Sequence, residues 1–373
     1  MNQQSLSRLR EYFQKHGTVA ALLSNSATVT WLTGYSAPIQ TGPSPFEGGP
    51  GLLWWHAGEL TLLLVDSEAA AGRASGAQVI EYGGYTVAEP LDCFKRQEVA
   101  VRLLLRDFDA ISGIVGIDFR FLPAALVPIL KEELPHASFI PIESDLDALR
   151  AVKSPEEISK ICAALNLCDS GQAFIQAHAK PGVSELQLWG TVKAHLELAA
   201  GLRLPVLTDL VAGIRTAEIG GLPQSYVLNT GDPLIFDLVP RMNGYWGDNA
   251  STYFVGEPST EMKQSYRTVS ETLKRGIEAV RPGIRACQLD TIMRESIRFA
   301  GYEPYPHHSG HGLGTTYHEE PRITPYNQSV LEAGMIIALE PGIYLPEHGG
   351  VRLEHALQVT HDGCQVLTHH LGL

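Results

Sequence analysis

Residues 233–254 read PLIFDLVPRMNGYWGDNASTYF and predict two short strands joined by a tight turn. The Asn-Gly pair at 243–244 favours a two-residue hairpin loop, because both central positions of that turn require positive φ. This turn places Asp237 opposite Ala250 in an antiparallel ladder. Since side chains alternate between the two faces of a strand, Asp237 and Asp248 should point to the same face as diagonal neighbours.

An aspartate in such an apolar strand needs a partner. Asp is depleted in strands, and Asp237 has apolar residues on both sides. A carboxylate in these surroundings requires a cation or several hydrogen bonds. Either one aspartate ends a strand and the other caps a turn, or the two share a metal ion. Two carboxylates on one face favour the metal.

Charge and composition exclude several classes of partner. The chain has 373 residues, a formal net charge of −13 and 44% hydrophobic residues, which predicts a globular protein of two domains. The negative charge argues against nucleic acid, since phosphate binding needs a basic surface. There is no run of about 18 apolar residues to span a membrane and no apolar core of a signal peptide. We therefore expect a cytoplasmic location.

The first half of the chain, residues 1–148, predicts an α/β domain in which strands and helices alternate. A helix is expected near Leu6 and another at residues 124–133, and the Gly/Pro-rich stretch 41–51 predicts a loop. Strands are expected at residues 19–23, 28–35, 52–55, 60–65 and 114–118. No catalytic group of residues is recognisable in this half.

The second half, residues 149–373, predicts an α+β domain. Ser154 and Glu157 have capping-box spacing around a first-turn proline, so a helix should begin at residue 155. Helices are expected at residues 155–179, 184–201, 260–280 and 286–300, and strands at residues 336–339, 343–345 and 351–359.

Further candidate ligands follow the hairpin. Residues 305–321 read YPHHSGHGLGTTYHEEP and contain four of the 14 histidines, beside alternating glycines that suggest imidazoles acting as ligands or proton carriers. Glu340 ends an apolar strand, and Arg352 and Glu354 should share one face of the last strand. Oxygen donors with an imidazole suit pairs of Mn, Co, Fe or Zn ions. Two ions about 3.5–4 Å apart can share a hydroxide and clamp an attacked carbonyl.

With these motifs the chain resembles the creatinase/prolidase/aminopeptidase P family of "pita-bread" metallopeptidases along its whole length. Residues 31–35, WLTGY, resemble the Tyr-Leu-Thr-Gly pattern of the family's N-terminal domain. Residues 150–157, RAVKSPEE, resemble the linker that enters the catalytic domain. The resemblance implies a creatinase/prolidase-like domain at residues 1–148 and a pita-bread catalytic domain at residues 149–373.

The same resemblance implies a role for each candidate. Asp237 chelates one metal ion, and His311 and Glu340 hold a second. Asp248 and Glu354 bridge both ions, and Glu340 also takes the proton of the bridging water. Three more residues match cleft residues that bind substrate or stabilise the tetrahedral intermediate: His307, His318 and Arg352.

The implied activity is hydrolysis of peptide bonds next to proline in short peptides, with a bridging hydroxide as nucleophile. The implied cofactors are two divalent ions, with Mn or Co placed ahead of Zn or Fe, and the implied assembly is a homodimer.

The chain departs from the family pattern at two places. Gly220 stands where members with peptidase activity usually carry a histidine, and Ala250-Ser251 replaces a Thr-Arg pair. The missing histidine allows three interpretations: a slow peptidase, a substitute role for His307 or His318, or a cleft that glycine has widened. We favour the third, because a glycine pair beside Pro223 removes bulk and adds backbone freedom.

Alternative functions follow from these departures. A widened cleft would allow a proline-specific carboxypeptidase-type activity, with Arg352 or Arg215 as partner of the peptide carboxylate. The creatinase branch cleaves a C–N bond without metal, and a third possibility is a non-catalytic binding module. Both of these predict an incomplete ligand set, so the five filled ligand positions favour the metallopeptidase.

Overall fold

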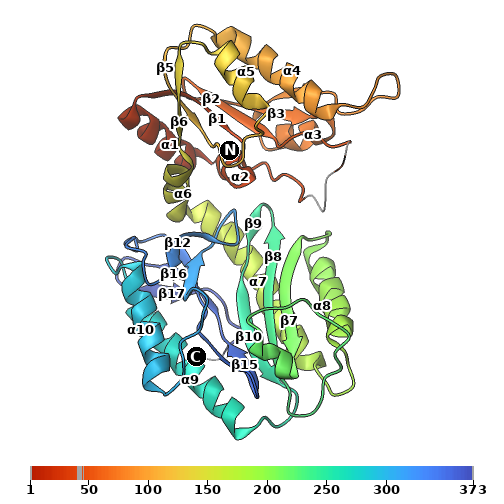
Figure 1. Ribbon diagram of the computed structural model, residues 1–373, viewed down its shortest axis with the longest axis vertical. Helices are drawn as coiled ribbons and strands as arrows, with labels where there is room; N and C mark the ends of the chain where they lie inside the picture. Colours follow the sequence, from red (N-terminus) through yellow and green to blue (C-terminus); the bar gives the residue numbers. More distant parts are fainter. Residues whose placement is uncertain (1, 40–43, 45, 372–373) are drawn as a thin grey trace. The chain divides into compact units, whose positions relative to one another are not determined.

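The computed structural model describes residues 2–39, 44 and 46–371 (Figure 1). The chain forms two compact units, Met1–Arg150 and Ala151–Leu373. Among the described residues, no helix combines the length and apolar character that crossing a membrane requires. Within the predicted loop at 41–51, residues 41–43 and 45 lie outside the described part, and the remainder has no helix or strand.

The first unit is α/β, as predicted. Its helices are α1 (Gln3–His16), α2 (Ser26–Thr33), α3 (Asp66–Ala74), α4 (Cys93–Leu105), α5 (Leu126–Glu133) and α6 (Glu143–Ala151). Its strands are β1 (Thr18–Leu23), β2 (Leu52–His56), β3 (Glu59–Val65), β4 (Gln78–Tyr82), β5 (Gly113–Ile117) and β6 (Ala137–Pro141), in the sheet order β4-β3-β2-β1-β5-β6.

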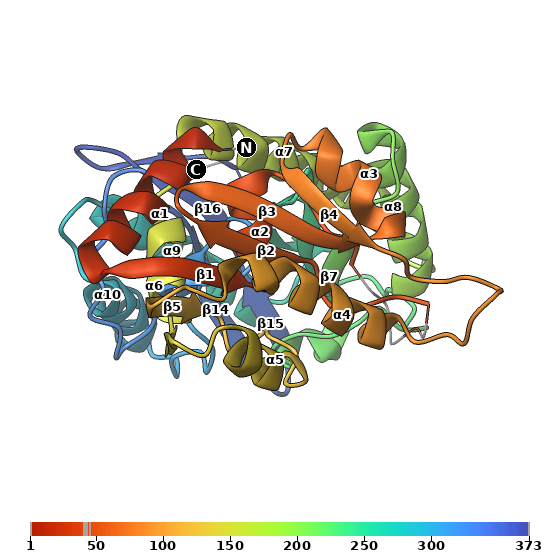
Figure 2. The same ribbon diagram turned by 90° about the horizontal axis from the view of Figure 1, so that it is seen from above.

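Both faces of this sheet are covered by helices, which explains its nearly continuous apolar strands. Helices α4 and α5 pack on one face, where Leu104 and Ile129 join the core with Leu22 (Figure 2). Helices α1, α2 and α6 contribute to the core on the opposite face.

The prediction of a strand at residues 28–35 is wrong, because this segment is helix α2. Asn25 caps the helix by accepting a hydrogen bond from the Ala27 N–H, and Gly34 ends it in the left-handed region at φ 77°. All residues from Ala27 to Thr33 are buried. The β-branched and aromatic composition therefore reflects burial in the core, and the caps decide the helix.

The second unit is α+β, as predicted. Its helices are α7 (Pro155–His178), α8 (Glu185–Ala200), α9 (Thr260–Ala279) and α10 (Ala286–Phe299). Its strands are β7 (Val206–Ala212), β8 (Pro233–Met242), β9 (Tyr245–Trp246), β10 (Asn249–Phe254), β11 (Gly310–Gly312), β12 (Glu319–Ile323), β13 (Ile336–Leu339), β14 (Gly342–Leu345), β15 (Gly349–Arg352), β16 (His355–Val359) and β17 (Cys364–Val366). The capping box of Ser154 and Glu157 is present.

Two helix pairs enclose the strands of this unit (Figure 1). Helices α7 and α8 share a core with the sheet β10-β8-β7, and α9 and α10 share a core with the sheet β12-β11-β13-β16-β17. The candidate ligands lie on the strands of these sheets and at their ends, which the helices support from outside.

The hairpin at 233–254 has the predicted register. Asp237 pairs with Ala250, and the turn residues Asn243 and Gly244 have φ values of 52° and 84°. Asp248 lies in the short gap between β9 and β10, where the Gly247 N–H still donates to the Pro240 carbonyl at 2.9 Å. The tight turn therefore fixes which strand residues face the site.

The prediction of one continuous strand at 351–359 is wrong. Strand β15 ends at Arg352, and β16 begins at His355. In the gap, the Leu353 N–H donates to the Pro341 carbonyl at 3.4 Å, and the Glu354 N–H donates to the Ala250 carbonyl at 2.9 Å. The chain changes partner strand here, and the change ties the Glu354 backbone to the hairpin residue that faces Asp237.

Candidate metal centre

Five predicted ligands from separate segments line one cavity of about 180 Å³ in the second unit. Asp237 lies within β8 and Asp248 immediately before β10. His311 lies within β11, Glu340 directly after β13, and Glu354 in the gap between β15 and β16. The remaining lining residues are Leu207, Thr208, Asp209, Val239, Tyr317 and His318.

The hydrogen bonding of His311 leaves one ring nitrogen free for a ligand. Its Nδ1 lies 2.9 Å from the Gly312 carbonyl oxygen, which can only accept, so Nδ1 carries the proton. The unprotonated Nε2 then lies 3.6 Å from both Asp248 Oδ2 and Glu340 Oε1. This is the arrangement in which a backbone carbonyl orients a metal-binding imidazole.

Two carboxylate oxygens of the cavity are suited to bind a cation, because no group among the described residues donates a hydrogen bond to them. Asp237 Oδ1 and Glu354 Oε1 are buried and have no hydrogen-bond partner among the described residues. One ligand atom each from Asp248, His311 and Glu354 lies within 4.8 Å of the others. A buried carboxylate oxygen without a donor is costly, and oxygen donors with one imidazole suit a divalent transition metal.

The pKa shifts of the carboxyl groups indicate that negative charge is crowded in this buried cavity. Burial raises the pKa of Asp237 to about 6, and burial together with neighbouring carboxylates raises the pKa values of Asp248 and Glu354 well above their ordinary range. Burial acts in the same direction on Glu340, but His308, His307 and His311 together outweigh it and lower the pKa of Glu340. Asp237, Asp248 and Glu354 therefore favour binding a proton or a metal ion over remaining ionised without a partner.

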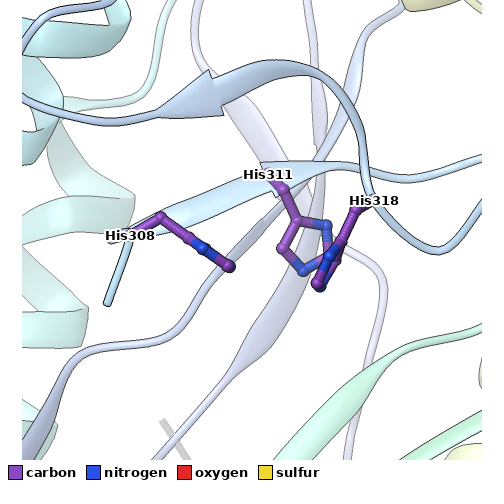
Figure 3. Close-up of side chains that lie close together, drawn as sticks. All are labelled: His308, His311 and His318. Carbon is purple, nitrogen blue, oxygen red and sulfur yellow. The ribbon is translucent and has the colours of Figure 1, made fainter. Parts of the chain in front are cut away.

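Figure 3 shows His308, His311 and His318 close together, and the last two of them line the cavity. The ring centres of His311 and His318 are 4.3 Å apart, and those of His308 and His318 are 5.2 Å apart. Burial lowers the pKa of His318 to about 4, so its imidazole is neutral at pH 7. His308 Nε2 lies 2.8 Å from Glu340 Oε1, within ion-pair distance.

His307 is not among the residues that line the cavity. Its Nδ1 lies 2.8 Å from the His308 carbonyl oxygen, so its Nε2 accepts from the Tyr344 hydroxyl at 2.9 Å. Its Nδ1 also lies 3.9 Å from Glu340 Oε2. His307 therefore contacts the Glu340 side of the site from behind the cavity wall.

A buried ion pair supports the loop that carries His318. Lys153 Nζ donates to Glu319 Oε2 at 2.5 Å, and the two side chains are 1% and 2% exposed. The other oxygen, Glu319 Oε1, accepts from the N–H groups of Thr315 and Thr316 at 2.9 and 3.1 Å. Glu319 thereby closes the turn that precedes it and fixes where His318 enters the cavity.

Arg352 also lies behind the wall and is not among the lining residues. Its guanidinium donates to Asp237 Oδ2 at 2.7 Å and to Asp209 Oδ2 at 2.9 Å, and it also donates to the Ile219 carbonyl. Arg215 pairs with the buried Glu185. Both arginines thus already pair with carboxylates of the protein, Arg352 with Asp209 and Asp237 and Arg215 with Glu185.

The cleft at Gly220 is not widened, contrary to the third interpretation of the missing histidine. A Cβ atom at this position would lie 2.6 Å from Asp209 Oδ2 and 3.1 Å from its Cγ and Oδ1. The carboxylate of Asp209, from strand β7, therefore fills the space that a side chain at residue 220 would occupy.

We expect the Gly220→Ala substitution to destabilise the protein by about 1–3 kcal/mol, the usual range for forcing extra carbon into a packed site. The new Cβ has to displace the Asp209 carboxylate from Arg352 and from the Gly221 N–H. Urea unfolding of wild type, Gly220→Ala, Asp209→Ala and the double variant measures the coupling. In the Asp209→Ala background, the Gly220→Ala substitution should lower the free energy of unfolding by much less. Equal costs in both backgrounds would show that Asp209 does not occupy this space.

Sequence reasoning missed Asp209 and Tyr317 and gave His308 no role. Asp209 carried a usable signal, because it interrupts the apolar segment VLTDLVA as Asp237 interrupts its own strand. His308 was one of four clustered histidines, but only the fold shows that it contacts Glu340. Tyr317 had no signal beyond its neighbour His318.

Two family models and several known proteins match this chain. Residues 159–361 match the model of metallopeptidase family M24, and residues 6–152 match that of the creatinase/prolidase N-terminal domain. An Xaa-Pro dipeptidase of Lactobacillus helveticus is 30% identical, covering 98% of this chain and 96% of the relative. An Xaa-Pro dipeptidase of Pyrococcus horikoshii is 28% identical, covering 98% of this chain and 97% of the relative.

Solved structures give the same picture for the fold. The crystal structure of the prolidase from Pyrococcus horikoshii OT3 has a TM-score of 0.84 and 26% identity, covering 99% of both chains. An Xaa-Pro dipeptidase from Bacillus anthracis has a TM-score of 0.84 and 25% identity, covering 100% of this chain and 98% of that one. The predicted creatinase-like domain and pita-bread domain are confirmed by these matches.

Proposed function

The chain belongs to metallopeptidase family M24, and from this premise we propose that it hydrolyses the Xaa-Pro bond of short peptides with two divalent metal ions. The observation that carries the proposal is the convergence of Asp237, Asp248, His311, Glu340 and Glu354 on one cavity. Relatives of nearly the same length are named Xaa-Pro dipeptidases, which supports the choice of substrate.

The metal ions would be held by these five side chains. Asp237 would chelate one ion, His311 and Glu340 would hold the other, and Asp248 and Glu354 would be shared between them. Oxygen donors with one imidazole favour Mn or Co, and a pair of such ions supplies Lewis-acid polarisation of a carbonyl and an activated water at neutral pH.

The chain's own residues handle the proton. The lowered pKa of Glu340 keeps its carboxylate ionised, so that it can accept a proton from the attacking water. Its Oε1 lies 2.8 Å from His308 Nε2, which donates to the carboxylate and favours its ionised form. His318 is neutral at pH 7, and its ring in the cavity can hydrogen-bond the oxygen of the attacked carbonyl.

The size of the cavity supports a short substrate. Its volume of about 180 Å³ is below the roughly 300–1,000 Å³ typical of pockets for drug-sized ligands. The test is a panel of Ala-Pro, Ala-Ala and longer Ala-Pro peptides with Mn²⁺ or Co²⁺. Cleavage confined to proline peptides supports the proposal, and equal cleavage of Ala-Ala contradicts the proline preference.

Metal should stabilise the fold, and more so at pH 7 than at pH 5. Asp237 has a folded pKa of about 6 against an ordinary 3.8, so the metal-free folded protein holds a proton that the unfolded chain releases between these values. Metal-free stability therefore falls as pH rises through this window, and bound metal removes that penalty. At 100 times Kd, an ion stabilises by about 2.7 kcal/mol.

The measurement is Tm of the chelated protein against Mn²⁺ concentration at both pH values. Asp248→Asn serves as the variant with a weakened response. A Tm that does not change with Mn²⁺ at pH 7, or a larger shift at pH 5, would contradict a metal site built from these carboxylates.

A further inference from the structure

Asp209 is a fixed carboxylate that the proposed chemistry does not use. Its residue pairs directly with Asp237 in the β7–β8 ladder. Its Oδ1 accepts from the Gly221 N–H at 2.9 Å and its Oδ2 from Arg352 at 2.9 Å. The Leu210 N–H donates to the Gly221 carbonyl at 3.0 Å. The carboxylate is therefore held in place from two sides, in the space beside Gly220.

The same carboxylate also faces the cavity. Its side chain is 31% exposed, whereas that of Arg352 is 3% exposed, and it lines the cavity wall. An ionised carboxylate has about four acceptor positions, and two of those of Asp209 are used. The side open to the cavity can accept further hydrogen bonds from a bound molecule.

The charge of the cavity determines which molecule fits. Its lining includes five carboxylates and two imidazoles but no lysine or arginine. Arg352, behind the wall, is shared between Asp209 and Asp237. Metal ions held by the other four carboxylates would compensate those groups and leave Asp209 outside the ligand set. On its cavity side the Asp209 carboxylate faces no cationic side chain among the lining residues, so this wall favours a cationic hydrogen-bond donor and disfavours a carboxylate.

We infer that Asp209 is a specificity-determining residue that binds a primary ammonium group of the substrate. This inference rests on the proposed peptidase function and adds to it which charge the substrate presents at this wall. Two parts of a peptide carry that chemistry, namely the free amino end and a lysine side chain in the first residue. Leu207 and Tyr317 in the same lining offer apolar surface to the carbon chain that bears the ammonium group.

Two matched peptide pairs distinguish the two sources. Ala-Pro and propionyl-Pro differ in the terminal amine, and Lys-Pro and norleucyl-Pro differ in the side-chain ammonium. We measure kcat/KM for all four with Mn²⁺ on wild type, on the isosteric Asp209→Asn variant, and on Asp362→Asn as a control. Asp362 is an exposed residue outside the cavity lining.

In Asp209→Asn, the kcat/KM ratio of one pair should fall by about 10-fold or more, the effect of losing a hydrogen bond between charged groups. The pair whose ratio falls identifies the source. The Asp362→Asn ratios should match wild type. An equal loss on all four peptides would show that Asp209 only positions Arg352, and unchanged ratios would show no role in recognition. Either result overturns the inference.

A second measurement, calorimetric titration of the metal-free protein, does not need turnover. It compares the binding of Lys-Pro with that of norleucyl-Pro, and the binding of Ala-Pro with that of propionyl-Pro. If wild type cleaves none of the four peptides, the proposed function fails, and the titration still decides the role of Asp209. A preference for the ammonium-bearing ligand that disappears in Asp209→Asn supports the inference, and no preference in wild type overturns it. Asp209→Ser replaces Asp209→Asn if circular dichroism shows that the latter is unfolded.

Discussion

The Glu354→Gln variant is expected to lose about three orders of magnitude in kcat on Ala-Pro, at the upper end of the range for removing a preorganised electrostatic stabiliser. Glu354 Oε1 is buried and has no hydrogen-bond donor among the described residues, and its carboxylate is grouped with Asp248 and His311. Gln keeps the shape but removes the charge that both proposed metal ions would share. Bound Mn²⁺ should fall together with the rate.

Loss of the fold would not explain this result. The pKa of Glu354 is raised by burial and by the neighbouring carboxylates Asp248 and Asp237, so a neutral side chain relieves repulsion in the metal-free protein. Its metal-free Tm should equal or exceed that of wild type at pH 7. Glu347→Gln, at an exposed residue outside the cavity lining, is the matched control. A Glu354→Gln variant with normal metal content and normal rate would exclude a bridging role.

The Lys153→Met substitution should lower the free energy of unfolding by about 3–5 kcal/mol, the usual effect of removing one partner of a buried ion pair. It removes the ammonium group of Lys153 from the buried carboxylate of Glu319. Because Glu319 also holds the N–H groups of Thr315 and Thr316, the turn before His318 should loosen and the rate should fall as well.

Lys160→Met is the matched control for this prediction. Lys160 pairs with Glu156 at 2.7 Å, but the two side chains are 31% and 60% exposed. Exposed pairs of this kind are worth less than about 1 kcal/mol. Urea unfolding measures both variants, and similar small losses for Lys153→Met and Lys160→Met would show that the buried pair does not anchor the turn.

Local signals in the sequence were sufficient for much of the fold. The Asn243-Gly244 turn allowed only one register, and the Ser154 capping box marked the start of α7, because both depend on a few neighbouring residues. At residues 28–35 the composition was misleading, since a buried helix and a buried strand have the same apolar and β-branched residues. There the caps at Asn25 and Gly34 decided the outcome.

Contacts between distant segments were beyond such signals. Glu354 leaves its strand because its N–H binds the Ala250 carbonyl, 104 positions earlier in the numbering. The missing side chain at Gly220 suggested a wider cleft, but the carboxylate of Asp209, on strand β7, fills the space. The sequence identifies which residue types are present near a site, whereas the fold decides which of them occupies a given space.

The most direct test of the metal-dependent peptidase is a titration of the chelated, dialysed protein with Mn²⁺, in which bound metal and Ala-Pro hydrolysis are followed in the same samples. We predict no hydrolysis without metal and a rate that reaches its plateau as the second ion binds to each chain. Full turnover by protein shown to be free of metal, or a plateau reached with no ion bound, would contradict the assignment of the five side chains to a two-metal catalytic site.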